Sequence, residues 1–369
     1  ISLAAVDDEY AEAAFVAETI ENMKANSSQI GYDDIAILYR SNYQSRNFEE
    51  CLRDLRIPYR IIGSRSFYER REVRDAVAYL RLIVNPRDDQ SFARIIASPP
   101  RGFGERALEI LRQEKNQSRR SFCEAIADNS SLVALGGKAA KAAAEMNRIF
   151  SKWRKEFSSP GNLAWKCENF LKEIGYIEGL LQMYKDRQEA LKRQENVFEL
   201  VNAMALFENN PDLDSANLSA FLEKYSLYDD SDKVEDNSES HPSVTLMTVH
   251  SAKGLEFECV FVVGMEFGVF PHERSLEENG IDEERRLFYV ALTRAKRNLF
   301  ISLVNFRMKH GQTSMQKPSP FITDIPENLI EHKEFFSRMP FVARARRMSG
   351  GRSRAPAWKK ASPLVSFDD

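Results

Sequence analysis

The sequence has no long apolar run, few cysteines and no marked excess of charge of either sign. A helix that spans a membrane needs about 18–20 consecutive apolar residues, so we expect no membrane span. The four cysteines stand far apart without a CxxC pair, which excludes a disulfide framework and the usual zinc spacing. We therefore expect a soluble protein of the reducing cytoplasm, without metal-ligating residues among its candidate sites.

The net charge and the length of the chain limit its possible binding partners and its number of domains. Lys and Arg number 52 and Asp and Glu 55, which gives a formal net charge of −3. No global basic field indicates nucleic acid, although a local basic surface can still bind it. The 369 residues, 43% of them hydrophobic, predict two or three domains with substantial cores. Because the chain begins at Ile1 rather than Met, we also expect a piece of a longer protein.

The N-terminal part of the chain alternates between helical and strand patterns, which is typical of an α/β domain. Residues 8–24 place apolar side chains on one helical face. The apolar run at 35–39 is typical of a strand buried in a parallel sheet, and 59–62 is a second strand candidate. A helix over 70–84 should end before the proline that follows, because the residue before proline avoids the α region.

The pattern changes after residue 87, where helical spacing continues and strand patterns stop. The segment 229–240 contains six acidic residues and one lysine, so it has too little apolar surface to order itself. We predict an all-α insert over 88–241 that ends in this mobile acidic linker. The helices expected in it are 105–126, 138–157, 163–173, 187–208 and 216–226.

Strand patterns return at 244–249, 259–265 and 298–304, with a helix over 282–296 between the last two. The simplest topology is one α/β domain with a parallel sheet that the all-α insert interrupts. This domain would consist of residues 1–87 and 242–333. The remaining segment, 334–369, is basic and contains glycine and proline, so we expect a disordered tail.

Three stretches carry residue types that suit nucleotide or nucleic-acid chemistry. The first follows a strand and contains Thr248, His250, Gly254 and Glu256. Glycine lets backbone approach a ligand, and a carboxylate can accept a hydrogen bond from a ribose hydroxyl. The second is the helix that ends near Arg294, where a guanidinium could reach a bound phosphate.

The third stretch places Arg40 and Asn42 after the strand at 35–39, at the edge where open α/β sheets hold ligands. Taken singly, each of these residues has an ordinary structural explanation. A histidine after a strand is more often a hydrogen-bonding residue than a contact to a ligand. Arginines beside Glu283 and Glu284 usually form a solvated, ion-paired helix face.

Taken together, the blocks resemble the second motor domain of the superfamily 1A DNA helicases, the family of UvrD, PcrA and Rep. The similarity is strongest to UvrD and PcrA and covers the chain to about residue 330. It implies a RecA-like sheet of the P-loop NTPase type. The matching segments are, in chain order, ILYRSNYQSR, PYRIIG, SFYERREVRDAVAYLRL, PPRGFG, TVHSAKGLEFECVFVVGMEFGVFPHERS and EERRLFYVALTRAK.

The resemblance also implies roles for individual residues. Arg294 matches the arginine finger that contacts the γ-phosphate of ATP across the cleft between two RecA-like domains. Glu256 matches the acid that binds the ribose, with Gly254 beside it. Arg40 and Asn42 match contacts to single-stranded DNA. Thr248 and His250 match residues of the single-strand track and its link to the nucleotide.

Two further positions follow from the resemblance. Gly102, Phe103 and Gly104 match a duplex-binding loop, where glycines let backbone N–H groups meet phosphates at a helix start. The aromatic residue that forms a wedge at the duplex fork in UvrD-like proteins falls at His310 here. A histidine offers less stacking surface than tyrosine or phenylalanine, which puts the wedge role in doubt.

The sequence lacks the two motifs by which a complete helicase binds ATP and Mg²⁺. No GxxxxGK[ST] motif occurs, and the run Gly136-Gly137-Lys138-Ala139 lacks the leading glycine and the Ser or Thr that holds Mg²⁺. No acidic DExx-type motif follows a strand. ATP with Mg²⁺ would therefore be bound mainly by a missing N-terminal half, and we expect this polypeptide alone not to hydrolyse ATP.

The resemblance thus implies the C-terminal half of an ATP-dependent 3′-to-5′ DNA helicase of repair or replication. Its expected partners are single-stranded DNA, a duplex junction, the N-terminal motor domain in cis, and repair or transcription proteins. A rival interpretation is a stand-alone module that binds DNA or a protein partner and has lost its motor half. A helicase–nuclease fusion is disfavoured, because only the short basic tail follows the motor domain.

Overall fold

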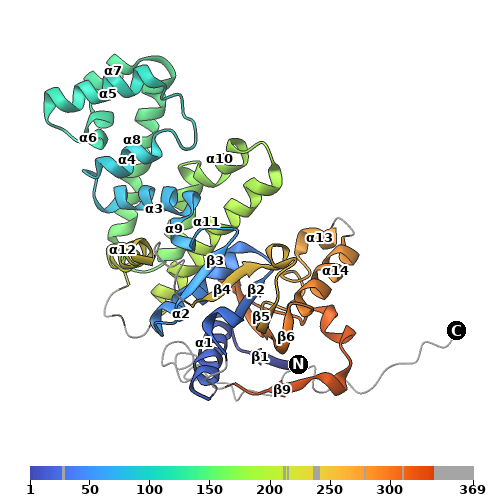
Figure 1. Cartoon of the computed structure of the whole chain (residues 1–369). Helices are drawn as coiled ribbons and strands as arrows, with labels where there is room; N and C mark the ends of the chain where they lie inside the picture. The colour runs from blue at the N-terminus through green and yellow to red at the C-terminus, as the bar shows by residue number, and fades with distance from the viewer. Residues whose placement is uncertain are drawn as a thin grey trace.

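A seven-stranded sheet, parallel throughout, forms the centre of the computed structural model (Figure 1). The structure describes residues 1–26, 30–210, 213, 216–235, 242–277, 280–309 and 311–335. The strand order is β3-β4-β2-β5-β6-β1-β9. The strands are β1 (Ser2–Val6), β2 (Ile35–Tyr39), β3 (Tyr59–Ile62), β4 (Val244–Thr248), β5 (Phe257–Val262), β6 (Ala295–Val304) and β9 (Glu331–Lys333).

The central strand β2 shows why this sequence forms a sheet covered on both faces. All five of its residues are buried, and its neighbours are β4 and β5. Side chains alternate along a strand, so Ile35 and Ile37 pack with Phe15 of α1 (Glu9–Asn26) on one face. Leu38 packs on the other face with Phe288 of α14 (Ile281–Leu292). The continuous apolar run therefore indicated a strand with helices on both sides, as expected.

The two ends of the chain complete one sheet, which confirms the expected α/β class and the interrupted topology. Strands β4, β5 and β6 come after the helical part and pair with β2 and β1 from before it. Strand β1, which lies between β6 and β9, and the edge strand β9 were not predicted. β9 contains no apolar residue and pairs only with β1, so its extended backbone comes from its neighbour rather than from its own pattern.

The helical part forms one large apolar core of its own. Figure 1 shows α5 to α8 far from the sheet, whereas α11 lies beside it. This core begins at Phe67 and includes α3, which the sequence grouped with the sheet. The division of the chain into domains at residues 87 and 242 stays a prediction. The helices are α3 (Arg71–Val84), α4 (Asp89–Ile95), α5 (Glu105–Ser118), α6 (Phe122–Ala127), α7 (Asn129–Leu135), α8 (Gly137–Ser158), α9 (Leu163–Glu173), α10 (Tyr176–Met183), α11 (Arg187–Glu208) and α12 (Leu218–Glu235).

Two expectations for the helical part were wrong. The single helix expected over 105–126 is two helices, because Ser121 starts α6 with a capping box to Glu124. The acidic linker expected from residue 229 is helical up to Glu235, where α12 ends. The rest of that segment, like most of the tail expected to be disordered (336–369), lies outside the described residues.

Two smaller elements border the sheet. α2 (Ser45–Asp54) follows β2, and the helix α14 expected over 282–296 ends earlier, because the chain enters β6 at Ala295. A hairpin of β7 (Phe306–Lys309) and β8 (Gln312–Met315) follows β6 and contacts α11. None of the helices in the described ranges has the length and apolar composition of a membrane span.

Candidate functional site

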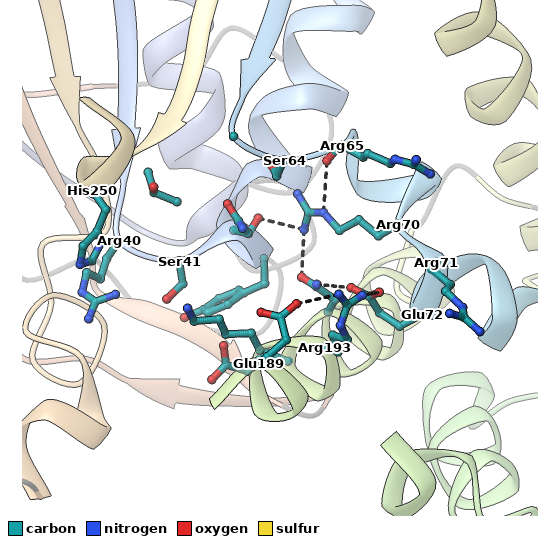
Figure 2. Close-up of a pocket in the computed structure, with 17 residues that line it drawn as sticks. Arg40, Ser41, Ser64, Arg65, Arg70, Arg71, Glu72, Glu189, Arg193 and His250 are labelled. Carbon is teal, nitrogen blue, oxygen red and sulfur yellow. Dashed lines mark hydrogen bonds and ion pairs between the residues drawn. The ribbon is translucent and has the colours of Figure 1, made fainter. Parts of the chain in front are cut away.

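A pocket of about 630 Å³ opens where β2 and β4 end. The carboxyl ends of parallel strands lie at one edge of a sheet, which is where such sheets bind ligands. Four predicted DNA contacts line this pocket together: Arg40 and Asn42 after β2, and Thr248 and His250 at the end of β4 and in the following 3-10 turn η5 (Val249–Ala252). The opposite wall is α11 of the helical part (Figure 2).

Arg40 is held by an ion pair with Glu284 at the start of α14. Its Nε and Nη2 donate to the two carboxylate oxygens over 2.6 to 3.1 Å. Burial alone raises the pKa of Glu284, but the hydrogen bonds and charge of Arg40 outweigh burial and lower it. Glu284 therefore stays ionised and neutralises Arg40, which the sequence could not show because the partners are 244 residues apart.

The other predicted strand contacts have simpler surroundings. Thr248 caps η5, and its Oγ1 accepts a hydrogen bond from the Ser251 N–H at 3.3 Å. His250 lies beside Arg40 in Figure 2 and reaches solvent, and partial desolvation of its ring together with the charge of Arg40 lowers its pKa. It is therefore neutral near pH 7, so it can stack or share a hydrogen bond but adds no positive charge. Asn42 lines the pocket, and its backbone carbonyl accepts a hydrogen bond from Arg70 Nη1 at 3.0 Å.

The pocket also gathers basic residues that the sequence analysis missed. Arg65 and Arg71 line it from the segment after β3, and Lys192 lines it from α11. All three side chains are exposed. Six basic side chains face three acidic ones in the pocket, so its lining carries a positive excess although the chain as a whole is slightly acidic. No local motif marks these residues, since only folding brings their segments together.

A buried ion-pair network joins α11 to the sheet part behind the pocket. Arg46 of α2 is 2% exposed and donates from Nε to Glu199 of α11 at 2.7 Å and from Nη1 to Glu50 at 3.0 Å. Burial works against ionisation of Glu50, but Arg46 outweighs it and keeps the pKa of that carboxyl low. A buried pair of this kind holds its partners in one geometry, because separating them leaves an uncompensated charge.

The predicted nucleotide residues form a second region around the end of α14. Arg294 follows this helix, and its side chain donates from Nε to the Val290 carbonyl at 3.0 Å and from Nη1 to the Leu255 carbonyl at 2.9 Å. The backbone of Phe257 donates to the Arg294 carbonyl at 2.9 Å. Arg294 and the exposed Glu256 therefore belong to one region of the surface, and their roles toward a nucleotide stay predictions.

This second region fits an anionic ligand. In the described part of the chain, the partners of the Arg294 guanidinium are oxygens without formal charge, two carbonyls and the Thr293 hydroxyl. Its positive charge is therefore not neutralised. Gly254 has φ +86° and no heavy atom within 4 Å of a Cβ built there, so backbone and ligand can approach each other. These features suit the phosphate and ribose of a nucleotide.

The predicted duplex loop lies away from both regions, in the helical part. Gly102 has φ +87°, which favours glycine, and Gly104 is the N-cap of α5. Phe103 is 8% exposed and packs in the helical core, so only its backbone is available to a ligand. Glu105 opens α5 and places a carboxylate at the helix start, which weakens its attraction for phosphate. His310 lies outside the described residues.

Comparison with known proteins decides the family. The model of the UvrD-like helicase C-terminal domain matches residues 1–305. The chain belongs to this family. It is 39% identical over 352 residues to the ATP-dependent DNA helicase UvrD1 of Mycobacterium tuberculosis H37Rv, which covers 91% of this chain and 45% of the relative.

Two further relatives agree with the UvrD-like assignment. DNA helicase II of Escherichia coli K12 is 38% identical over 336 residues, which is 90% of this chain and 45% of that protein. The ATP-dependent DNA helicase PcrA of Bacillus subtilis 168 is 39% identical over 332 residues, with 88% and 44% covered. The chain therefore spans less than half the length of the curated relatives it matches. The predicted resemblance to UvrD and PcrA is confirmed.

Proposed function

We propose that this chain is the C-terminal half of an ATP-dependent 3′-to-5′ DNA helicase that unwinds duplex DNA. Its sheet would be the second motor domain (1–87 and 242–333), and its helices an accessory domain (88–241). The observation that carries this proposal is the state of Arg294, whose guanidinium contacts only uncharged oxygens within the described residues. The direction of movement comes from the family resemblance alone.

On the nucleotide side, Arg294 would act as the arginine finger. A guanidinium held by two backbone carbonyls is oriented before ATP arrives, and it can stabilise the charge that spreads over the transferred phosphoryl group. Glu256 would accept hydrogen bonds from the ribose hydroxyls, with Gly254 leaving room for the ligand. Mg²⁺ would neutralise phosphate charge when ATP is bound, and the missing half would hold it together with the phosphate cradle.

On the DNA side, the pocket with Arg40, Asn42, Thr248 and His250 would hold single-stranded DNA. Its basic excess supplies the attraction for phosphates, which dominates affinity without selecting a sequence. The loop Gly102–Gly104 and the hairpin tip at His310 would contact the duplex ahead of the strand. The pathway, its repair or transcription partners and a cytoplasmic location stay predictions.

The decisive experiment replaces Arg294→Ala in the full-length protein. ATP turnover should fall by about 10³-fold or more, the range that an arginine finger contributes. Affinity for a single-stranded oligonucleotide should stay within about twofold, because Arg294 does not line the pocket. Arg286→Ala is the matched control, since Arg286 is an exposed residue of the same helix paired with Glu283.

Two results would contradict the proposal. Normal ATP turnover in the Arg294→Ala protein would remove the arginine-finger assignment. Single-strand binding by a natural protein no larger than this chain, with no motor half in the cell, would favour the stand-alone binding module. Immunoblotting of a cell extract with an antibody against this chain distinguishes the two cases by the size of the protein.

A further inference from the structure

Helix α14 contacts both proposed sites. Glu284 lies in its first turn and binds Arg40, which lines the pocket. Arg294 follows its last turn and binds the carbonyl of Val290. The helix also packs against η5, the turn that carries His250. Ten residues separate Glu284 from Arg294, which corresponds to about 15 Å along an α-helix.

Glu284 is bound more completely than an ordinary surface carboxylate. It is 3% exposed and accepts three hydrogen bonds from Arg40. It accepts two more from the Ser275 hydroxyl at 2.8 Å and from the His272 N–H at 3.1 Å. Donors on several sides fix both the place and the rotation of the carboxylate, so Arg40 is held in one orientation.

The neighbouring residues of α14 show that this arrangement is specific to Glu284. Glu283 pairs with Arg286 at 3.3 Å, and both side chains are 78% exposed. Arg285 pairs with Asp282 and Asp324, also at the surface. Such exposed pairs contribute little, because solvent screens them. Glu284 alone in this acidic turn reaches across to the strand-end pocket.

We propose that Glu284 is a positioning residue that orients Arg40 toward the DNA strand and couples this contact, through α14, to the position of Arg294. This inference rests on the proposed function and deepens it. Glu284 engages Nε and Nη2 of Arg40, whereas Nη1 has no hydrogen-bond partner within the described residues. Nη1 is therefore the group left for a DNA phosphate.

The ion pair with Glu284 has two opposite effects on how Arg40 binds DNA. Glu284 neutralises Arg40 and so reduces its electrostatic attraction for DNA, but it fixes the guanidinium to the helix that ends at Arg294. Any shift of α14 that accompanies nucleotide contact then moves the strand contact as well. Removing the negative charge should therefore leave DNA binding intact while it uncouples DNA binding from ATP turnover.

The test is Glu284→Gln in the full-length protein, with Glu283→Gln as the matched control on the same helix turn. In the Glu284→Gln protein, the stimulation of ATP turnover by single-stranded DNA should fall at least about tenfold. Affinity for an oligothymidylate should stay equal or rise by up to about threefold, because Arg40 regains its free charge. The Glu283→Gln protein should match the wild type in both measurements.

A second variant covers the case in which Glu284→Gln fails to fold. Arg40→Lys keeps the positive charge but cannot form the two-point contact with the carboxylate. It should lose stimulation to the same extent as Glu284→Gln, and the affinity comparison stays with Glu284→Gln because Arg40 is itself a proposed strand contact. A melting curve of each variant identifies folded protein.

Two distinct failures are recognisable. If both variants keep wild-type stimulation, or if the affinity of the Glu284→Gln protein falls in step with its stimulation, Glu284 does not act as a coupling residue. If the wild type itself shows no DNA-stimulated ATP turnover, the proposed function is wrong, and this inference falls with it. Wild-type stimulation together with an inactive Arg294→Ala protein separates the first failure from the second.

Discussion

The two arginine-bearing regions of this molecule differ in how their charge is compensated. In the region between the sheet and α11, Arg40 and Arg46 each face carboxylates that are themselves largely buried. At the far end of α14, Arg294 is held by uncharged oxygens alone within the described residues. Arg40 and Arg46 are thus paired with carboxylates, whereas Arg294 keeps an uncompensated positive charge.

This difference distinguishes Arg46, whose buried ion pairs stabilise the fold, from Arg294, whose positive charge is available to a ligand. A paired, buried arginine costs several kcal/mol to disrupt, because its partner is left charged and without water. An arginine fixed by carbonyls is oriented at little cost to stability and keeps its charge for an anion. Substitution of the buried Arg46 should therefore change stability, and substitution of Arg294 should change activity.

The largest effect is expected for Arg46→Met, which breaks the buried network at Glu199 and Glu50. The free energy of unfolding should fall by about 3–5 kcal/mol, as for other buried pairs that lose one partner. Urea denaturation measures the change. Arg286→Met, at an exposed pair, should change stability by about 0.5 kcal/mol or less. Equal effects of the two variants would contradict the comparison.

A smaller effect concerns Glu9, a buried carboxyl beside the paired region. Burial raises its pKa to about 7, against the opposing charge of Arg307 and with support from Glu199 and Asp8. The folded protein then binds a proton that the unfolded chain releases between about pH 4.5 and 7. Stability should therefore fall as pH rises through this interval, by up to about 3 kcal/mol.

Glu9→Gln should abolish this contribution and stabilise the protein at pH 8 relative to the wild type. Glu21→Gln, an exposed change on the same helix, should keep the wild-type pH dependence. Denaturation curves from pH 4.5 to 8 compare the three proteins. A Glu9→Gln protein with the full wild-type slope would show that another group titrates.

A still smaller effect is expected for Lys192→Ala on the α11 wall of the pocket. Affinity for single-stranded DNA should fall by about threefold, and the slope of log K against log salt should decrease by about 0.7. Lys155→Ala, on α8 outside the pocket, is the control. An unchanged salt slope in the Lys192→Ala protein would place the strand elsewhere.

A small effect on stability is expected at the second region. Arg294→Ala removes hydrogen bonds to two carbonyls but leaves no buried charge behind, so unfolding should become easier by only about 1 kcal/mol. Urea denaturation beside Arg46→Met tests this ranking. A loss as large as that of Arg46→Met would mean that Arg294 also holds the fold.

The local patterns of the chain determined most of the secondary structure and the family. Apolar runs such as 35–39 have one low-energy solution, a strand covered on both faces, and helical spacing placed α8, α9 and α11 nearly to the residue. The ordered motifs around Arg40, His250 and Arg294 indicated the UvrD-like family, which the comparisons confirm. These patterns lie within short segments, so they can be recognised in the sequence without the tertiary structure.

Only the tertiary structure decided which charges meet. Arg40 and Glu284 stand 244 residues apart, and Arg46 and Glu199 stand 153 apart, so no local pattern relates them. The edge strand β9 likewise forms because it pairs with the backbone of β1, since its own residues do not favour an extended conformation. Pairing, burial and the positive excess of the pocket depend on distances across the fold, and folding alone sets those distances.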